Sequence, residues 1–590
     1  MNEITLITKA AELRIADDWL ATHNGRLVLD TETTGLDVFA ADFEIGVVAL
    51  GHSSGAVLAF PGRDRDLVRA VLQRAFATAR SIWAHNAIYD AWALRATSEL
   101  KLSSLKCSLV AARVAYPDRF PPPKGRKGPE HGFSLKDLRP TTQHAQDALK
   151  TSFSSDYPAE ARRSDWLPRA VRLLPWDTDE LLAYVAEDVV AGARLVDDIA
   201  ADRNARPFIN DEIATDQLWR WTGFDGIHVD LERLQQLADK AAPTLAEAEK
   251  HFGFKPWTGN KARQEYLRKL GVQLPTTDGG ALKLGKKERP AAEVPEEAQA
   301  EWDMFCASIE AHSDQTQVAQ FLASGGLLRG QISVNAAITG RSTSRNPNLQ
   351  NMSPAIREAV IARPGCVLVG ADLSHVEPSI LAALSGDPLL IEHCARGRDV
   401  YIEVAAVVWG PEAFAVDAAG APTPDAAKLR KRAKVVFLAL SYGMGDTSFA
   451  SMLGATTDEA KLIRQKALGV YTGLARFSKE LQQRARNGDR LTTLDGRNLP
   501  LLSDAPYRAV NYSIQASAAT LFKKMTRDVA AQLPFGARCL IPVHDELVVE
   551  CLAADAETVA DIIRSAMHVE IAGTPVWGDP EIIGTRWRKS

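Results

Sequence analysis

Two carboxylates near the start of the chain are spaced so that they could bind a metal ion together. Asp30 and Glu32 stand at the end of the run RLVLD (26–30), whose apolar and β-branched residues predict a strand. Side chains two residues apart on a strand point to the same face. The pair therefore forms an oxygen-rich platform for a hard cation. Strand alternation alone also produces exposed acid pairs.

Two later segments carry further candidates for the same site. Asn86 and Asp90 follow the strand-like run SIWAH (81–85). Tyr184 and Asp188 are four residues apart in a helix-periodic segment, so they share one face of that helix. A Tyr–Asp pair at this spacing is usually structural when it stands alone. The three pieces together favour a shared acidic site.

A second acidic pair is split between two distant strand-like segments. Asp372 ends the apolar run VLVGAD, and Asp545 lies in VHDE between two apolar runs. An aspartate in such surroundings is costly to bury unless it is paired or bound to metal. The VHDE segment predicts a hairpin turn that presents Asp545 and Glu546. The alternative is an acidic turn that faces water.

A basic helix supplies positive charge in the same part of the chain. Arg430 and Lys434 are four residues apart in the segment 428–444, and Leu438 and Tyr442 continue the same helical face. A cationic start followed by an apolar and aromatic end could hold a triphosphate and then stack on a base. A helix that packs on a core could show the same face by accident.

Three patterns of secondary structure must position these residues. Residues 1–205 alternate strand-like and helix-like runs, which predicts an α/β layer domain. Residues 206–330 are helical and charged, and residues 331–590 mix both types. The individual elements expected are strands at 26–30, 43–50, 56–60, 81–85, 366–374 and 540–552, helices at 64–79, 231–252 and 428–444, a loop at 117–132 and a polar segment at 276–298.

Composition is ordinary for a globular protein of several domains. The 590 residues are 46% hydrophobic and 24% charged, with a formal net charge of −5. The six cysteines are scattered without a C-x-x-C pair, which argues against a zinc ribbon or a disulfide framework and fits a reducing cytosol. No signal peptide or membrane span is indicated.

Basic residues gather locally although the chain is acidic. The clusters lie at 124–128, 428–434 and 586–589. A local groove can hold phosphates while the rest of the surface is acidic. Each cluster taken alone is better explained as a solvent-exposed face than as a phosphate-binding site.

The amino-terminal acidic set resembles the DEDD exonuclease superfamily in its tyrosine-bearing branch, over about residues 20–200. The resemblance implies that four carboxylates hold two divalent metal ions and that Tyr184 orients the attacking water. Mg²⁺ is expected at this site, with Mn²⁺ as an alternative. Two such ions can clamp the attacking and leaving oxygens of phosphodiester hydrolysis. The implied metal ligands are Asp30, Glu32, Asp90 and Asp188, and Asn86 is expected to contact DNA.

Residues 339–550 resemble family A DNA polymerases, whose motifs occur here in family order. ADLSHVEPSILAALSGD (371–387) is similar to motif A, RKRAKVVFLALSYGM (430–444) to motif B and VHDELVVE (543–550) to motif C. The segments TGRSTSRNPNLQNMSPAIREAV (339–360) and RAVNYSIQASAATLF (508–522) are similar to two further palm signatures. Many ordered matches of this kind are specific for the family.

The resemblance assigns roles by position. Asp372 and Asp545 would be the metal ligands of nucleotidyl transfer, again with two Mg²⁺ ions, and Glu546 would stand beside them. Arg430 and Lys434 would contact the incoming triphosphate. Glu377 would exclude a 2′-hydroxyl group, Tyr442 would sit at the templating position, and His375 and Leu438 would also lie at the nucleotide. The residues expected along the primer–template are Arg341, Asn511, Gln515 and His544.

Phosphoryl transfer needs positioning and charge neutralisation more than covalent catalysis, which two metal-binding carboxylates and two cations would supply. Motif B departs from its usual pattern because Leu438 stands where an aromatic residue is normal. Ring stacking on the nucleotide sugar would then be lost, which predicts altered discrimination among sugar-modified nucleotides. Motif A departs at His375, Pro378 and Ser379.

The expected fold is multidomain, α/β and α+β, with an RNase H-like exonuclease domain followed by a right-hand polymerase. The expected function is template-directed DNA synthesis with 3′→5′ proofreading, in replication and by analogy of a bacteriophage. The alternative is an exonuclease with a non-catalytic DNA-binding carboxy-terminal region; RNA templates stay open. The predicted domains are 1–205 exonuclease, 206–330 thumb, 331–386 palm, 387–500 fingers and 501–590 palm.

The expected partners are a DNA primer–template and deoxynucleoside triphosphates. The chain is expected to be a monomer in the cytoplasm, of a bacterial host if phage-encoded. Related bacteriophage enzymes sometimes recruit an accessory protein through the thumb, so a processivity or replisome factor is a further candidate partner.

Overall fold

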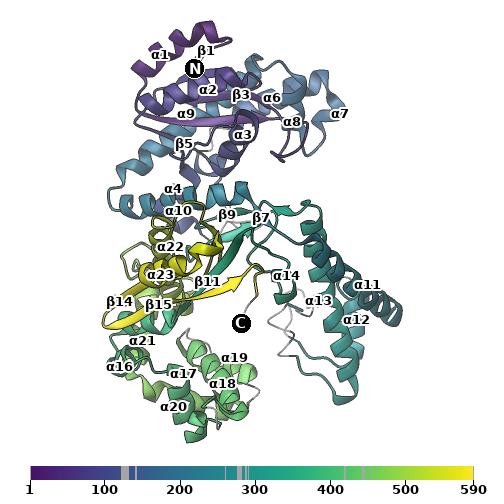
Figure 1. The fold of residues 1–590 in the computed structure, drawn as a ribbon, viewed down its shortest axis with the longest axis vertical. Coiled ribbons are helices and arrows are strands. Elements are labelled where there is room, and N and C mark those ends of the chain that lie inside the picture. Colours follow the sequence, from purple (N-terminus) through teal and green to yellow (C-terminus); the bar gives the residue numbers. More distant parts are fainter. Residues whose placement is uncertain are drawn as a thin grey trace. The chain divides into compact units, whose positions relative to one another are not determined.

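The computed structural model describes residues 2–120, 132–139, 143–259, 261–274, 282, 284, 285, 289, 292–417, 420–441, 446–453 and 455–588 (Figure 1). The chain divides into two compact units. Unit 1 is Met1–Phe224 with Gln331–Thr343 and Gly496–Pro500, and unit 2 is Asp225–Gly330, Ser344–Asp495 and Leu501–Ser590. Within the described residues, no helix is long and apolar enough to cross a membrane.

Unit 1 is built on a mixed six-stranded sheet in the order β1-β4-β3-β2-β5-β6. Strand β2 runs antiparallel to β3 and parallel to β5, so it stands where the sheet changes direction. The strands of this sheet are β1 (Glu3–Leu6), β2 (Arg26–Thr33), β3 (Ile45–Gly51), β4 (Ala56–Pro61), β5 (Ser81–Ala84) and β6 (Lys106–Cys107). Strand β9 (Gln331–Ser333) also belongs to unit 1 but lies outside this sheet.

The helices of unit 1 are α1 (Leu13–Thr22), α2 (Arg65–Thr78), α3 (Ile88–Ser98), α4 (Ser108–Ala115), α5 (Leu135–Leu138), α6 (Gln143–Asp156), α7 (Pro158–Ala161), α8 (Trp166–Leu173), α9 (Asp179–Ala201) and α10 (Arg206–Asp225). Of these, α2, α3, α4, α8 and α9 contact the six-stranded sheet.

Helix α9 packs closely on β2 and β3 because the sheet has a glycine, Gly51, where the helix crosses it. A Cβ at Gly51 would lie 2.6 Å from Cγ2 of Val189, so any larger residue there would push the helix away. Val189 follows Asp188, and this close approach sets the depth at which the Asp188 carboxylate meets the strand that carries Asp30.

Unit 2 contains a five-stranded antiparallel sheet in the order β12-β13-β11-β15-β14. Strand β11 is central, and both of its neighbours come from the last fifty residues of the chain. The strands of the unit are β7 (Ile227–His228), β8 (Leu327–Leu328), β10 (Thr343–Arg345), β11 (Cys366–Ser374), β12 (Arg538–Val543), β13 (Glu546–Leu552), β14 (His568–Ile571) and β15 (Thr574–Gly584).

Two long helices of unit 2, α11 (Leu231–Phe252) and α13 (Gln299–Leu322), pack side by side (Figure 1). The side chain of Asp230 caps the first turn of α11 by accepting a hydrogen bond from the Arg233 amide. Gly253 ends the helix in the left-handed conformation, with φ of 70°. These two residues fix the bounds of α11.

The other helices of unit 2 include a cluster formed by α17, α18 and α20, which pack on one another. The set comprises α12 (Lys261–Lys269), α14 (Pro354–Arg357), α15 (Val376–Ser385), α16 (Pro388–Ala395), α17 (Val400–Trp409), α18 (Pro424–Ser441), α19 (Asp446–Leu453), α20 (Thr457–Val470), α21 (Thr472–Arg486), α22 (Ala509–Ala530) and α23 (Ala556–Ala566).

One hydrophobic core joins the sheet of unit 2 to the helix pair. Leu368 of β11, Val548 of β13, Leu234 of α11 and Phe321 of α13 are all fully buried in it, and so is Trp587 near the end of the chain. Burial of an aromatic side chain of this size contributes a few kcal/mol, at roughly 25 cal/mol per Å² of apolar surface. Trp587 therefore anchors the described end of the chain in this core.

The expected elements are present where the structure describes them. The segment 540–552, which looked strand-like throughout, forms β12 and β13 with the predicted turn between them. Much of 117–132 and of 276–298 lies outside the described residues, as does the basic cluster at 124–128. The contact division groups α10 with unit 1, whereas the sequence boundary fell at residue 205. The five predicted domains stay predictions.

Candidate active sites

The amino-terminal acidic residues meet at one end of β2. Oxygen atoms of Asp30, Glu32 and Asp188 all lie within 4.8 Å of one another, which is close enough to share a metal ion. Asp30 and Glu32 come from β2, and Asp188 comes from α9, which packs across that strand. The sequence spacing that suggested a common platform is therefore realised in space.

Asp90 joins this group through β2. Its Oδ1 accepts hydrogen bonds from the backbone amide of Thr31 at 3.1 Å and from the Thr31 hydroxyl at 2.8 Å. Thr31 stands between the two acids of β2, so Asp90 on α3 is fixed against the same short stretch of strand. Asp90 is only 3% exposed. All four predicted carboxylates thus gather at one place.

The gathered carboxylates perturb one another. Burial, reinforced by the negative charge of Asp90, raises the pKa of Asp30 to about 7. Burial and the charge of Asp30 raise the pKa of Asp188 to about 7 as well. Burial raises the pKa of Asp90 to about 6, and burial with the three neighbouring carboxylates raises the pKa of Glu32. Negative charges on all four carboxylates would repel one another, and a bound cation would stabilise the ionised forms.

The donor set fits hard divalent cations. Every candidate ligand atom is a carboxylate oxygen, which suits Mg²⁺ or Mn²⁺ and not softer metals. Oδ1 of Asp188 is buried and has no hydrogen-bond partner among the described residues. A buried carboxylate oxygen without a partner is costly, and coordination of a metal would satisfy it.

Tyr184 lies beside this cluster, one helical turn before Asp188. It is 6% exposed, and burial followed by the charge of Glu32 raises the pKa of its hydroxyl. The phenol is therefore neutral, and it lies close enough to Asp188 to influence the pKa of that carboxylate. Asn86 adopts a left-handed backbone with φ of 64° between β5 and α3.

Two residues near the carboxylates were not predicted from the sequence. Burial and the charge of Asp30 raise the pKa of Asp188, and the positive charge of Lys136 on α5 offsets part of that rise, which places this ammonium close to the cluster. The hydroxyl of Tyr89 donates a hydrogen bond to the Gly35 carbonyl at 2.6 Å and also contacts the Thr33 hydroxyl, which ties α3 to the end of β2. Tyr89 directly precedes Asp90, but nothing in its spacing marked it.

The second acidic pair meets on the sheet of unit 2. Asp372 of β11 is paired with Glu546 of β13, and the backbone amide of Leu373 donates to the carbonyl of Asp545 at 3.0 Å. The backbones of Asp372 and Asp545 are therefore adjacent, although 172 positions separate them in sequence. Asp372 is exposed and Asp545 is half-buried. The predicted convergence of these two segments is confirmed.

Glu546 is held from two sides. Its Oε2 accepts a hydrogen bond from Nη1 of Arg357 at 3.0 Å, and its Oε1 accepts one from the indole of Trp587 at 3.1 Å. The Arg357 guanidinium also lies 4.8 Å from the centre of the Trp587 ring. Glu546 is 6% exposed. Both of its oxygens thus have protein partners, unlike those expected of a free metal ligand.

The turn that carries Asp545 has a special backbone. His544 adopts φ of 55°, and it is exposed at the tip between β12 and β13. His375, at the start of α15, has φ of 57° and stacks on Trp577 of β15, with ring centres 5.5 Å apart. A left-handed residue at both turns redirects the chain directly beside the two aspartates.

The basic face of α18 is built around Tyr401. The Arg430 guanidinium lies 5.5 Å from the Tyr401 ring centre, and the Lys434 ammonium lies at the same distance. Arg430 is also paired with Asp399 at 2.6 Å, and the other oxygen of Asp399 caps α17. The two predicted triphosphate ligands are therefore on one face, next to an aromatic ring that the sequence did not reveal.

The rest of the predicted nucleotide site is described in part. The charge of Glu377 contributes, after burial, to a raised pKa of Tyr401, so Glu377 lies near the same ring. Phe437 packs edge-on against Tyr401 at 5.7 Å. Tyr442 lies outside the described residues, and so does the side chain of Leu438.

The predicted DNA contacts are distributed over both units. Asn511 and Gln515 are one turn apart on α22, both half-buried, and Oδ1 of Asn511 has no hydrogen-bond partner among the described residues. Arg341 belongs to unit 1. Of the basic cluster at 586–589, Arg586 is paired with Asp230 at 2.7 Å, so it is not simply a solvated charge.

Comparison with known proteins identifies both halves of the chain. Residues 4–202 match the family described as 3'-5' exonuclease, and residues 313–582 match DNA polymerase family A. The two matches contain the two acidic sites. The chain belongs to the family A DNA polymerases and carries an amino-terminal 3′→5′ exonuclease domain.

Full-length relatives are found in bacteriophages. The DNA polymerase of Mycobacterium phage D29 is 25% identical, covering 97% of this chain and 94% of the relative. That of Mycobacterium phage L5 is 24% identical, covering 99% and 96%. DNA polymerase I of Deinococcus radiodurans is 32% identical over 43% of this chain and 28% of the relative.

A solved structure shares the fold. It is described as the POL domain of Pol1 from M. smegmatis in complex with DNA primer-template and dNTP. The TM-score is 0.74 at 22% identity, with 98% of each chain covered. The expected combination of exonuclease and polymerase folds is thereby confirmed.

Proposed function

We propose that this enzyme replicates DNA with Asp372 and Asp545 as the carboxylates of nucleotidyl transfer, and that it proofreads at the Asp30 cluster. The observation that carries the proposal is the hydrogen bond from Leu373 to Asp545, which joins β11 to the turn before β13. It supports a shared site for two acids that are remote in sequence. Mg²⁺ held by these acids would neutralise the charge of the transferring phosphate.

The face of α18 supports a role in binding the triphosphate. Arg430 and Lys434 present two cations on one side of the helix, and the Asp399 pair restrains the Arg430 side chain. A cation that is already fixed in position loses little freedom when it binds phosphate oxygens. Glu377 near Tyr401 supports a steric role at the sugar.

At the nuclease site, the proposed division of labour follows from the four acids. Asp30, Glu32, Asp90 and Asp188 would hold two Mg²⁺ ions, which supply an activated water and stabilise the leaving oxygen. Tyr184 stays neutral and can orient that water through its hydroxyl, and Lys136 would offset the negative charge of the DNA phosphates. Asn86, Arg341, Asn511, Gln515 and His544 are proposed to contact DNA.

The phage relatives support replication of a bacteriophage genome, in the cytoplasm of a bacterial host, as the biological role. The substrates proposed are a DNA primer–template and deoxynucleoside triphosphates, which is what the M. smegmatis polymerase holds in its complex.

Primer extension on a recessed DNA duplex tests both activities together. With Mg²⁺ and all four nucleotides the primer should lengthen to the end of the template. With Mg²⁺ alone the same primer should shorten from its 3′ end, and with EDTA it should stay unchanged. A primer that shortens but never lengthens would leave only the nuclease half of the proposal.

A further inference from the structure

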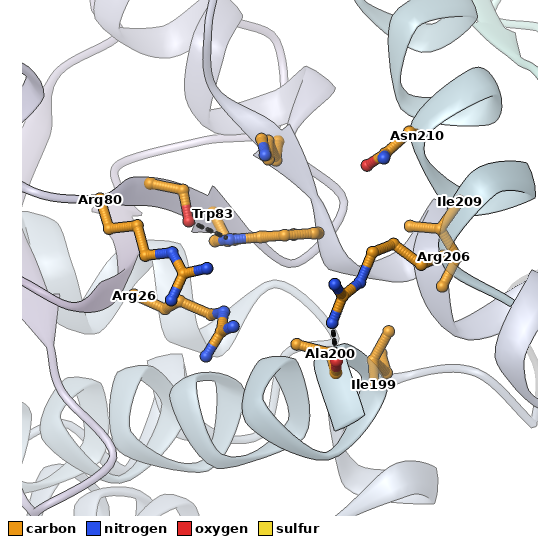
Figure 2. A pocket seen from close by; sticks show the side chains of 10 residues that line it. Arg26, Arg80, Trp83, Ile199, Ala200, Arg206, Ile209 and Asn210 are labelled. Atoms are coloured by element: carbon orange, nitrogen blue, oxygen red, sulfur yellow. Dashed lines mark hydrogen bonds between the residues drawn. The ribbon is translucent and has the colours of Figure 1, made fainter. Parts of the chain in front are cut away.

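A basic pocket lies in unit 1, away from the acidic cluster. Its walls come from the first residues of β2, β5 and β6, from the end of α9 and from the start of α10 (Figure 2). The cavity has a volume of about 170 Å³. It is smaller than sites for drug-sized ligands, which hold roughly 300 Å³ or more, and it suits a phosphate group with part of a sugar.

The pocket and the nuclease site stand at opposite ends of one strand. Arg26 begins β2 and lines the pocket, whereas Asp30 and Glu32 lie toward the other end of the strand. At about 3.3 Å per residue, Arg26 and Asp30 are about 13 Å apart along the strand. A ligand in this pocket would not touch the carboxylates.

Four cations surround the cavity. Arg26 and Arg80 extend their guanidinium groups from one side and Arg206 from the other (Figure 2), and Lys106 also lines it. The Lys106 ammonium lies 5.3 Å from the centre of the Trp83 ring. Positive groups that converge on one small space repel one another unless an anion is bound between them.

These charges are poorly balanced by the protein itself. Arg26 is paired with Asp197 at 3.0 Å, and Arg206 donates to the Ala200 carbonyl at 2.9 Å. Among the described residues, the side chains of Arg80 and Lys106 have no carboxylate partner. Burial, followed by the charges of Arg26 and Arg80, lowers the pKa of Lys106.

Apolar side chains complete the lining. The Trp83 indole donates its hydrogen bond to the Ser81 hydroxyl at 2.9 Å, so its polar edge is already satisfied. Ile199 and Ile209 form part of the opposite wall. A cationic site with an apolar wall matches a ligand that carries both a phosphate and a less polar sugar or base.

We propose that this pocket binds the phosphate monoester of a nucleotide, with the phosphate between the arginines and Lys106 and the nucleoside against the apolar wall. The phosphate could belong to a free nucleoside monophosphate or to the 5′ end of a DNA strand, and both present the same chemistry. Guanidinium groups bind such phosphates through paired, charge-assisted hydrogen bonds. The pocket shares no lining residue with either of the two proposed catalytic sites.

Calorimetric titration of the full chain in EDTA tests the proposal, because metal-dependent binding at the two catalytic centres is then removed. The probe is dTMP, and the variants are R80Q, which replaces an exposed side chain, and R80Q/K106Q. R14Q/R65Q is the matched control, since it removes two exposed arginines of the same unit that do not line the pocket. The single variant K106R, which keeps the positive charge at this position, is a second control.

Each lost charge-assisted bond should weaken dTMP binding about tenfold. We expect R80Q to weaken it by this factor and R80Q/K106Q by more, whereas the control and K106R should stay within about twofold of wild type. Equal affinities in wild type and R80Q/K106Q, or no binding to wild type, would overturn the proposal.

Two further titrations distinguish the source of the phosphate. A 5′-phosphorylated oligothymidylate that binds more tightly than its unphosphorylated form, with the difference lost in R80Q, would indicate a DNA end. Tighter binding of dTMP than of the phosphorylated strand would indicate a free nucleotide. Inorganic phosphate that binds as well as dTMP would overturn the role assigned to the apolar wall.

Discussion

The contacts of Glu546 predict that Arg357 positions the polymerase carboxylates from outside the site. The side chains of Arg357 and Glu546 are 16% and 8% exposed, so their 3.0 Å ion pair is largely shielded from water. Removing one member of a buried pair typically costs about 3–5 kcal/mol, because the other charge is left without compensation. The Trp587 hydrogen bond remains, so R357A should lose about 3 kcal/mol of folding stability.

The effect on catalysis follows from the neighbouring residue. Glu546 begins β13 directly after Asp545, and a carboxylate that rotates toward water would pull the turn with it. A displacement of about 1 Å at a reacting group can reduce the rate about 100-fold. We therefore expect the kcat of nucleotide incorporation by R357A to fall about 100-fold, while degradation of single-stranded DNA is unchanged.

A second arginine–glutamate ion pair on β13 provides a control. Arg363 pairs with the fully buried Glu550 of β13 at 2.6 Å, and Arg538 pairs with the same carboxylate at 2.9 Å. R363A should therefore also lower stability, by less than R357A because Arg538 remains. It should leave kcat close to wild type, because Glu550 is four residues from the turn's edge.

Single-turnover incorporation and urea unfolding of both variants would separate the two effects. Adding E546Q to R357A removes the uncompensated charge, so stability should largely return while incorporation stays slow. If R357A incorporates nucleotides as fast as R363A, Arg357 only stabilises the fold and the positioning argument is wrong.

Three other predictions concern the two sites and the nucleotide. Asp545→Asn should abolish primer extension and leave degradation intact, and Asp30→Ala should do the reverse and raise the error rate; loss of both activities by either folded variant in gel assays would contradict two separate sites. Because burial and mutual repulsion raise the pKa values of Asp30 and Asp188 to about 7, protons compete with metal below that pH. The Mn²⁺ concentration for half-maximal degradation should thus be much higher at pH 6 than at pH 8, and equal values would count against this carboxylate cluster as the metal site. Leu438→Phe should change the ratio of dideoxynucleotide to deoxynucleotide incorporation, and an unchanged ratio in competition assays would reject the stacking argument.

The sequence predicted the elements whose signals are local. Helix α11 has a capping aspartate before it and a glycine after it, and its observed bounds, 231–252, are those expected. The strands that carry Asp30 and Asp372 were visible as apolar runs. The two acids of β2 are neighbours for purely local reasons, since two residues of one strand share a face.

The contacts between remote segments could not be predicted in this way. Trp587 read only as part of a basic cluster, yet it is fully buried and hydrogen-bonded to Glu546. Tyr401 gave no signal either, because its role depends on how α17 packs against α18. Hydrophobic periodicity tells which face of a helix is buried, but not which element covers that face.

The order of strands in unit 2 also constrains how the chain folds during synthesis. Strand β11 pairs with β13 and β15, so residues 366–374 wait for residues 546–584 to leave the ribosome. The first six strands, by contrast, all lie within residues 3–107 and can assemble early. Translation at about 5–20 residues per second therefore leaves β11 unpaired for roughly ten seconds or more. During that interval the exposed apolar residues of β11 can pair with wrong segments, and a chaperone that binds apolar segments would protect this strand.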